Sequence, residues 1–276
     1  MSVASGETGQ PIGGAHLVVS GKPYDADASG QVVLADRVPY GSFVDVTAAG
    51  FLDRQTLLRK NGDRRFVLWP RSTPWGLNES YTEELIYTYG SADPPPAGSS
   101  PLERIRRGTK EAVVVVSEEI RLNGRANEAH QIAVGHINEG LAGKVTYVLA
   151  PTRPTSGVIF EASVDPADPV CAERVLGYSQ LSLQSGEIIG AKVVYCRLDG
   201  VDASLVSHEL GHTTGLNHSP DSRDLMYAFA NRVERFSRAE TLSLSMLFER
   251  SGGNRFPDND RDVAGAGSGT RTIVCY

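Results

Sequence analysis

The sequence predicts an α+β protein in which a small all-β sandwich domain, residues 1–70, precedes a larger domain, residues 71–276. Between residues 10 and 70, short segments of alternating apolar and polar residues are separated by Gly, Pro and Asp, which is typical of strands joined by turns. From about residue 102, strand-like segments are mixed with longer segments of helical periodicity, as in α+β domains. A chain of 276 residues is long enough for two hydrophobic cores.

The clearest strands of the first domain are expected at residues 15–19, 31–34, 42–46 and 65–69. Strands this short indicate a small sandwich. The phrases Gly13-Gly14-Ala15, 25–30 and 48–51 resemble those of carboxypeptidase-regulatory-like (transthyretin-like) modules. The resemblance covers most of this domain and implies a β-sandwich that accompanies another domain.

A calcium-binding loop is one interpretation of part of this domain. Asp25, Asp27, Ser29, Gly30 and Asp36 match the spacing of such a loop, with aspartate at the last position where glutamate is usual. These loops normally lie between two helices, whereas the flanking segments here are strand-like. A plain hairpin turn is therefore the alternative to a Ca²⁺ site.

The domain boundary is expected near residue 70. The segment 91–101 is rich in Pro, Gly and Ser, as in linkers and loops. The residues before it include Trp75, Tyr81 and Leu85, and they are too apolar for a free linker. We therefore interpret 91–101 as a loop within the second domain, with a boundary near residue 100 as the alternative.

The second domain continues with a buried strand at residues 112–116. Ala129, Ile132, Ala133, His136 and Ile137 recur at helical spacing and predict one apolar helix face. Further strands are expected at residues 145–149, 157–162, 175–183 and 187–195. The next helix is expected to begin near residue 201, and Ser237 with Glu240 forms a capping box that opens a final helix.

The most informative feature is the uninterrupted segment from His208 to His218. His208 and His212 are four residues apart, so on a helix they lie on one face, one turn apart, and can reach the same metal ion. Glu209 lies about 100° round the helix from His208, beside the metal. Gly215 can adopt a positive φ and reverse the chain, which brings His218 in as a third ligand. Three histidines with a fourth position left for water are typical of a catalytic Zn²⁺.

The pattern H-E-x-x-H-x-x-G-x-x-H, followed by Met226, resembles the signature of the metzincin zinc metallopeptidases. Ser219 after the third histidine and the segment 224–227 resemble the matrixin branch. The resemblance implies a matrixin-like domain with a mixed twisted sheet and three main helices. It also implies that Glu209 is the general base for a metal-activated water and that Met226 packs as a floor beneath the histidines. Ala228 stands where some metzincins have a zinc-binding tyrosine, so that ligand is not implied.

The segment Leu176, Gly177 and Tyr178 resembles the edge strand at which metzincins hold their substrate. An extended protein or peptide substrate could add to this edge by main-chain hydrogen bonds. We therefore expect these residues to border the substrate.

The resemblance predicts a zinc-dependent endopeptidase. The alternative is a non-catalytic surface binding or adhesion protein, in which the sandwich recognises a glycan or a protein and the protease domain is degenerate. The intact motif argues against this alternative. A third hypothesis is a latent enzyme whose cleft is blocked by the first domain or by the tail that carries Cys275.

Composition restricts the partners and the location. A net charge of −6 argues against nucleic acid as a partner. No apolar run approaches the roughly 18 residues of a membrane span. Residues 1–10 lack the pattern of a signal peptide. Because metzincins are usually exported, we expect a secreted or cell-surface protein whose signal has been removed, with a cytoplasmic location as the alternative. The sequence does not predict the oligomeric state.

The three cysteines allow two interpretations. Cys171 and Cys196 flank a predicted hairpin and could form a disulfide, which would leave Cys275 near the end of the chain. Three reduced, partly buried thiols are the alternative, because spacing does not establish a pairing. Cys171 lies within the catalytic region, so the upstream cysteine that caps zinc in many matrixins is not expected.

Overall fold

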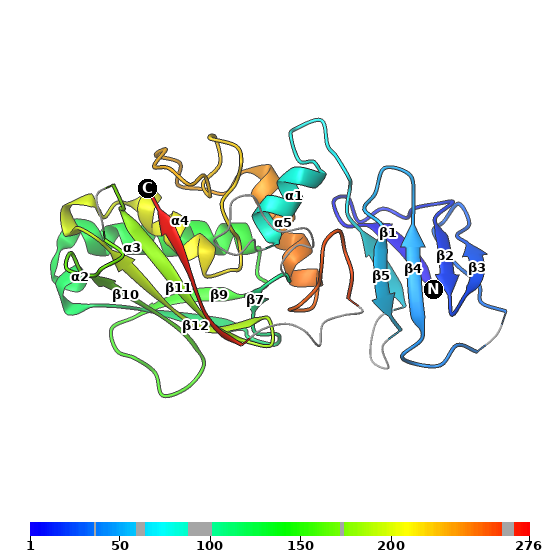
Figure 1. Cartoon of the computed structure of the whole chain (residues 1–276), viewed down its shortest axis with the longest axis horizontal. Coiled ribbons are helices and arrows are strands. Elements are labelled where there is room, and N and C mark those ends of the chain that lie inside the picture. The colour runs from blue at the N-terminus through cyan, green and yellow to red at the C-terminus, as the bar shows by residue number, and fades with distance from the viewer. Residues whose placement is uncertain (36, 59–63, 88–100, 172–173, 261–267) are drawn as a thin grey trace.

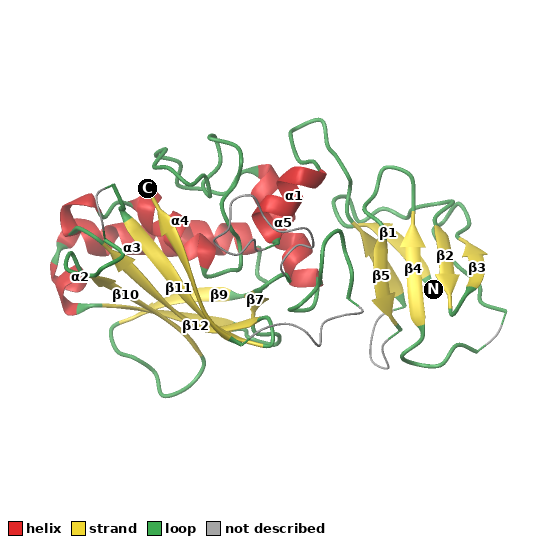
Figure 2. Cartoon of the chain, viewed as in Figure 1, coloured by secondary structure: helices red, strands yellow, loops and turns green. Residues whose placement is uncertain are grey.

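The computed structural model describes residues 1–35, 37–58, 64–87, 101–171, 174–260 and 268–276. The chain is of mixed α+β class, with several sheets and helices (Figures 1 and 2). The predicted loop at residues 91–101 lies outside these ranges except for Pro101. None of the helices in the described ranges combines the length and the apolar content that a membrane span requires.

The first part of the chain forms two small sheets (Figure 2). The larger is antiparallel, in the order β3 (Lys22–Asp25), β2 (His16–Val19), β4 (Phe43–Thr47) and β5 (Arg54–Leu57). In the smaller one, β1 (Ser2–Ser5) pairs in parallel with β6 (Arg65–Leu68). Leu17, Val19, Val44 and Val46 alternate with more exposed neighbours and point into one core, as the two-residue period of a strand requires.

The prediction of a strand at residues 31–34 is wrong. Gln31 makes only an isolated bridge to Ser2, and Val33 is 86% exposed. Sequence reasoning also missed β1, β3 and β5, because none of these four-residue strands has a clear apolar alternation of its own. The described part of residues 1–70 contains strands and no helix. Its assignment to a regulatory-like module stays a prediction.

The second part is built on a seven-stranded sheet in the order β13-β11-β12-β10-β8-β9, with β7 paired to β12. The strands are β7 (Arg104–Ile105), β8 (Glu111–Val116), β9 (Thr146–Ala150), β10 (Val158–Val164), β11 (Gly177–Gln184), β12 (Glu187–Tyr195) and β13 (Gly269–Cys275). Strand β11 is antiparallel to both of its neighbours, β12 and β13, and the other pairs are parallel.

Helices α3 (Gly124–Leu141) and α4 (Ala203–His212) run along one face of this sheet, and α5 (Arg238–Glu249) and α1 (Glu79–Ile86) lie toward the first part of the chain (Figure 1). The short α2 (Glu118–Leu122) precedes α3, and a 3₁₀ turn at Leu198–Gly200 precedes α4. The apolar face predicted for α3 is buried at Ala129, Ala133, His136 and Ile137. The prediction is wrong at Ile132, whose side chain is exposed because it lies at the margin of this face.

Two clusters of buried side chains form the cores. One contains buried residues between Val3 and Leu68, and the other extends from Leu52 and Trp69 to Cys275. The sequence-predicted boundary near residue 70 lies close to the change from one cluster to the other, and its assignment stays a prediction.

Buried charged groups join the two parts of the chain. Arg250 is completely buried and forms an ion pair with Asp258 at 2.6 Å. Its guanidinium also donates a hydrogen bond of 2.8 Å to the backbone oxygen of Val67 on β6. Arg54 on β5 reaches in the opposite direction and donates to the carboxylate of Asp260 at 3.2 Å. The segment that follows α5 is therefore fixed to the first part by charge-assisted hydrogen bonds.

Cys171 and Cys196 form a disulfide, and Cys275 is a buried free thiol. The alternative of three reduced thiols is therefore wrong. A disulfide is compatible with an exported protein.

Candidate metal centre

Helix α4 carries two of the three predicted histidine ligands. The side chain of Asp202 caps its N-terminus by accepting a hydrogen bond of 3.0 Å from the Leu205 backbone N–H. The chain turns after the helix at Gly215, whose φ is 113°. A Cβ atom at this position would lie 2.2 Å from the backbone oxygen of Glu103. Only glycine meets both requirements, and the turn directs His218 back toward α4.

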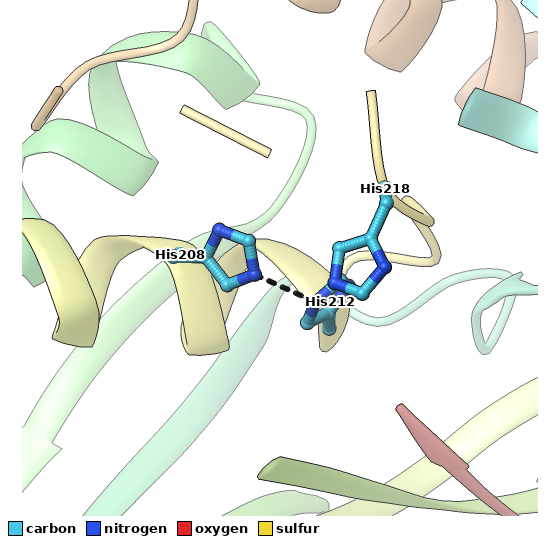
Figure 3. Close-up of side chains that lie close together, drawn as sticks. All are labelled: His208, His212 and His218. Atoms are coloured by element: carbon cyan, nitrogen blue, oxygen red, sulfur yellow. Dashed lines mark hydrogen bonds between the residues drawn. The ribbon is translucent and has the colours of Figure 1, made fainter. Parts of the chain in front are cut away.

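The imidazole rings of His208, His212 and His218 converge (Figure 3). Their ring centroids are 4.7 Å, 4.9 Å and 5.4 Å apart. One ring nitrogen from each lies within 4.8 Å of the other two, which is a separation that a single metal ion can bridge. Two of these residues are buried, and His218 is half-buried.

Hydrogen bonds to backbone carbonyls fix the tautomers of two of these rings. The Nδ1 atom of His208 lies 2.8 Å from the Leu225 oxygen, and that of His212 lies 2.8 Å from the Leu216 oxygen. A carbonyl oxygen only accepts, so each Nδ1 carries a proton and each neutral ring directs the lone pair of Nε2 inward. The two Nε2 atoms face each other at 3.0 Å. Two lone pairs this close repel one another unless a cation lies between them.

A zinc ion fits this arrangement. With Zn–N bonds of about 2.0–2.1 Å, two nitrogens of a tetrahedral site lie about 3.3 Å apart. The Nε2 atom of His218 is buried and has no hydrogen-bond partner within the described residues, so it is also available to a metal. Nδ1–H bonds to carbonyls are the usual outer support of metal-binding histidines.

The protonation states agree with this donor set. Burial lowers the pKa of His208 to about 4 and that of His218 to about 3. Burial and the neighbouring histidines hold the pKa of His212 well below its ordinary value. All three rings are therefore neutral near pH 7, which is the form that binds a metal.

Glu209 follows the first histidine and is completely buried. Its Oε2 atom accepts a hydrogen bond of 2.6 Å from the hydroxyl of Ser179 on β11, and its Oε1 atom has no hydrogen-bond partner in the described part of the chain. Burial raises the pKa of Glu209 to about 8, against the opposing effect of the Ser179 hydrogen bond. A carboxyl group of this kind can take up and release a proton near neutral pH.

Met226 packs directly against α4. A Cβ atom on Gly211 would lie 2.3 Å from the Met226 sulfur, so the absence of a side chain at Gly211 permits this contact. The Met226 oxygen accepts a hydrogen bond of 2.7 Å from the Ser219 N–H. The Met226 N–H donates a hydrogen bond of 2.7 Å to the carboxylate of Glu240. The turn around Met226, which we call the Met226 turn, is thereby held by Ser219 on one side and by Glu240 on the other.

Sequence reasoning missed two residues of this site. Glu240 was predicted as half of a capping box with Ser237, and the structure confirms that box. Its second contact, with the Met226 N–H, has no local sequence signal. Ser179 lies within a correctly expected strand, but nothing in the sequence indicates that it contacts Glu209, which is 30 residues away.

Leu176, Gly177 and Tyr178 do not border an open sheet edge in this structure, and the expectation that they border the substrate stays a prediction. Strand β13 pairs with β11 from Gly177 to Leu183 and makes β11 an internal strand. The last residues of the chain were not predicted as a strand, because a glycine-rich segment precedes them and their pairing partner is distant in sequence.

The residues of the predicted calcium loop have other contacts. The Oδ1 atom of Asp27 accepts hydrogen bonds from the N–H and hydroxyl of Ser29, which is typical of a turn. Asp25 contacts His16 at 2.9 Å. Asp25 and Asp27 belong to no group of three candidate metal ligands among the described residues. Asp36 lies outside those residues, so Ca²⁺ binding stays a prediction.

No family model matches this sequence, and no curated protein matches it. Among solved structures, the chain is similar to metalloproteinase-II from Bacteroides fragilis, at 12% identity and a TM-score of 0.33. The similarity covers 89% of this chain and 84% of the other. Both the identity and the TM-score are low, so this similarity lends no weight to a function.

Proposed function

We propose that this chain is a zinc-dependent endopeptidase of the metzincin type. Residues 71–276 would form the matrixin-like catalytic domain, and residues 1–70 a β-sandwich of the carboxypeptidase-regulatory-like kind. The observation that carries the proposal is the cluster of His208, His212 and His218. Backbone carbonyls engage the Nδ1 atoms of His208 and His212, which leaves their inward nitrogens for a metal, and the Nε2 atom of His218 has no hydrogen-bond partner in the described residues.

His208, His212 and His218 would hold the ion. Three imidazole nitrogens are a donor set that suits Zn²⁺, and a site of three protein ligands leaves one position for reaction. When bound, Zn²⁺ supplies Lewis-acid polarisation of a water molecule and of a peptide carbonyl.

Glu209 would act as the general base and then as the general acid. Its buried carboxyl group takes a proton from the attacking water and delivers it to the departing amine. The Ser179 hydroxyl holds one oxygen of this carboxyl group, which leaves Oε1 for the proton transfer. Met226 packs beneath the histidine-bearing helix, and Glu240 fixes the backbone of the Met226 turn.

The substrate class is protein or peptide, and the location is secreted or cell-surface. The disulfide between Cys171 and Cys196 supports an oxidising compartment.

Metal analysis and casein cleavage test the proposal. The wild-type chain is expected to retain zinc after dialysis, whereas His212→Ala is expected to lose it, and a chelator is expected to abolish casein cleavage until zinc is restored. Casein should be offered to the full chain and to a shortened chain that ends at residue 268 and therefore lacks strand β13. Absence of cleavage by both zinc-loaded chains would contradict an endopeptidase, and equal zinc content in the wild type and His212→Ala would contradict the ligand set.

A further inference from the structure

We propose that strand β13 is a self-inhibitory segment of this protein. It occupies the edge of β11 at which an extended peptide would be held, and it must leave before the site can accept a substrate. This inference rests on the proposed peptidase function, and it deepens that function by assigning a means of regulation to the same site.

The first observation is the pairing of β13 with β11. The two strands are antiparallel and stay in register from Gly177 opposite Cys275 to Leu183 opposite Gly269. An extended peptide that adds to a sheet edge uses the same main-chain donors and acceptors. A substrate and β13 therefore compete for one set of hydrogen bonds, and Figure 1 shows β13 (red) running alongside β11.

The second observation is that the end of the chain also bonds on its other side. The Tyr276 N–H donates to the Ala228 oxygen at 3.0 Å, and the Ala230 N–H donates to the Tyr276 oxygen at 2.9 Å. These partners follow the Met226 turn directly, whereas Cys275 accepts from the Leu176 N–H at 3.1 Å. The end of the chain is thus held on both sides, by β11 and by the segment after Met226.

The third observation is the position of the inward-facing side chains. Arg271 and Cys275 lie four residues apart, on the same face of the strand. The Arg271 guanidinium forms a 2.8 Å ion pair with Glu103 and donates at 2.6 Å to Asn217, the residue before His218.

At the other end of the strand, ligand atoms of Cys275, His208 and Glu209 lie within 4.8 Å of one another. Strand β13 therefore extends along the metal centre from the His218 side to the His208 side. Glu209 has no exposed surface in this arrangement, and the Cys275 sulfur lies beside its carboxylate.

Strand β13 is held by main-chain pairing and by the side-chain contacts of Arg271, and few of its side chains are buried. Only Cys275 of its seven residues is buried, and Gly269, Thr270 and Thr272 are exposed. Next to it lies a cavity of about 200 Å³, lined in part by the apolar side chains of Leu205, Leu225 and Phe229. A substrate with an apolar side chain in this cavity would gain contacts that β13 does not make. Burial of that side chain would favour displacement of β13 by the substrate.

A removable cross-link tests the proposal in the full chain. Gln180 on β11 and Thr272 on β13 are directly opposite, with their side-chain atoms 3.3 Å apart. The pair Gln180→Cys with Thr272→Cys would lock β13 to β11 after oxidation. The matched control is Gln180→Cys with Lys192→Cys, which uses the same β11 position but joins it to β12. Mass spectrometry confirms each cross-link, and the native disulfide is common to both proteins.

The locked protein is expected to be nearly inactive on casein. Mild reduction should raise its rate about tenfold or more, because apparent affinity scales with the fraction of molecules whose site is open. The β11–β12 control should change little on reduction. A chain that ends at residue 268 should exceed the full chain in rate if it remains folded by circular dichroism. Equal rates for the locked and reduced proteins would overturn the proposal.

A binding assay separates this proposal from the peptidase function. Fluorescently labelled, carboxymethylated casein is titrated against the locked and reduced proteins in a Glu209→Gln background, where turnover is not needed. Tighter binding after reduction supports the role of β13 even if no form of the protein cleaves casein, in which case only the peptidase function fails. Equal binding before and after reduction overturns the role of β13, whatever the cleavage assay gives.

Discussion

The hydroxyl of Ser179 on β11 donates a 2.6 Å hydrogen bond to the carboxylate of Glu209 on α4. The proposed catalytic base is therefore attached to the strand that β13 covers. The same hydroxyl lies 2.9 Å from the backbone oxygen of Glu209, so Ser179 also aligns β11 with the histidine-bearing helix. Ser179 thus holds both the proposed base and the helix that carries it against β11.

Replacing the base should separate metal binding from catalysis. Glu209→Gln keeps the shape of the side chain but removes its capacity to accept a proton, so casein hydrolysis should fall by roughly 10²- to 10⁴-fold. Zinc content, measured by elemental analysis, should stay that of the wild type because the proposed ligands are the three histidines. Ser179→Ala, which retains the carboxylate, should lose less activity. Wild-type rates in Glu209→Gln would remove Glu209 from the mechanism.

Metal removal should lower stability. A ligand that binds only the folded chain adds about 2.7 kcal/mol to the free energy of unfolding when its free concentration is 100 times its dissociation constant. Urea denaturation of chelated and zinc-loaded protein measures this difference. His218→Ala should remove the zinc-dependent increase. His16→Ala, at an exposed histidine on β2, should retain it, and loss of the increase in this control would argue against the proposed ligands.

Two glycine-to-alanine substitutions should change the free energy of unfolding in opposite directions. Gly215→Ala places a Cβ atom 2.2 Å from the Glu103 oxygen at a φ of 113°, so we expect a loss of about 3 kcal/mol or more in the free energy of unfolding. Gly135 is exposed on α3, and no atom lies within 4 Å of its Cβ position. Gly135→Ala should stabilise the chain by up to about 1 kcal/mol. Thermal and urea denaturation compare the two, and equal effects would contradict the close approach at Gly215.

Glu240 should give the metal-free protein a pH-dependent stability. Burial, reinforced by the nearby charge of Asp224, raises its pKa to about 7 from an ordinary value of 4.5. Between these values the folded chain binds a proton that the unfolded chain has released. Its contribution to the free energy of unfolding therefore falls as pH rises, by about 1.4 kcal/mol per pH unit and about 3 kcal/mol in all.

The variant Glu240→Gln cannot titrate, so its stability relative to the wild type should increase between pH 5 and pH 8. Urea denaturation of the two metal-free proteins across this range measures the change. A difference that stays constant with pH would mean that Glu240 keeps an ordinary pKa, held ionised by its hydrogen bonds from Met226 and Ser237.

Local sequence patterns sufficed for much of the fold and for the histidine cluster. The three histidines lie within eleven residues, and helix geometry followed by one glycine turn determines how they meet. The strands of the second part have continuous or alternating apolar residues because both faces of their sheet, or one of them, are buried. The capping box at Ser237 is also a local signal.

Contacts between distant segments were not predictable in the same way. Strand β13 pairs with residues about ninety positions earlier in the chain, and only the completed sheet brings them together. Arg271 and Glu103 are a second example, since nothing near either residue indicates its partner. The pattern of β11 was interpreted correctly as a strand, but its place within the sheet depended on a strand that the sequence did not reveal.

The buried ion pair of Arg250 and Asp258 has a consequence for any attempt to divide this protein. A fragment beginning at residue 71 would keep both charges but lose the Val67 oxygen that receives the guanidinium and the Arg54 side chain that faces Asp260. Arg250 would keep its ion pair with Asp258, and Asp260 its hydrogen bond from Asn254, but the loss of these two further contacts would weaken the network. We therefore expect a fragment that begins at residue 71 to be less stable than the intact chain, and the intact chain to unfold in a single cooperative transition.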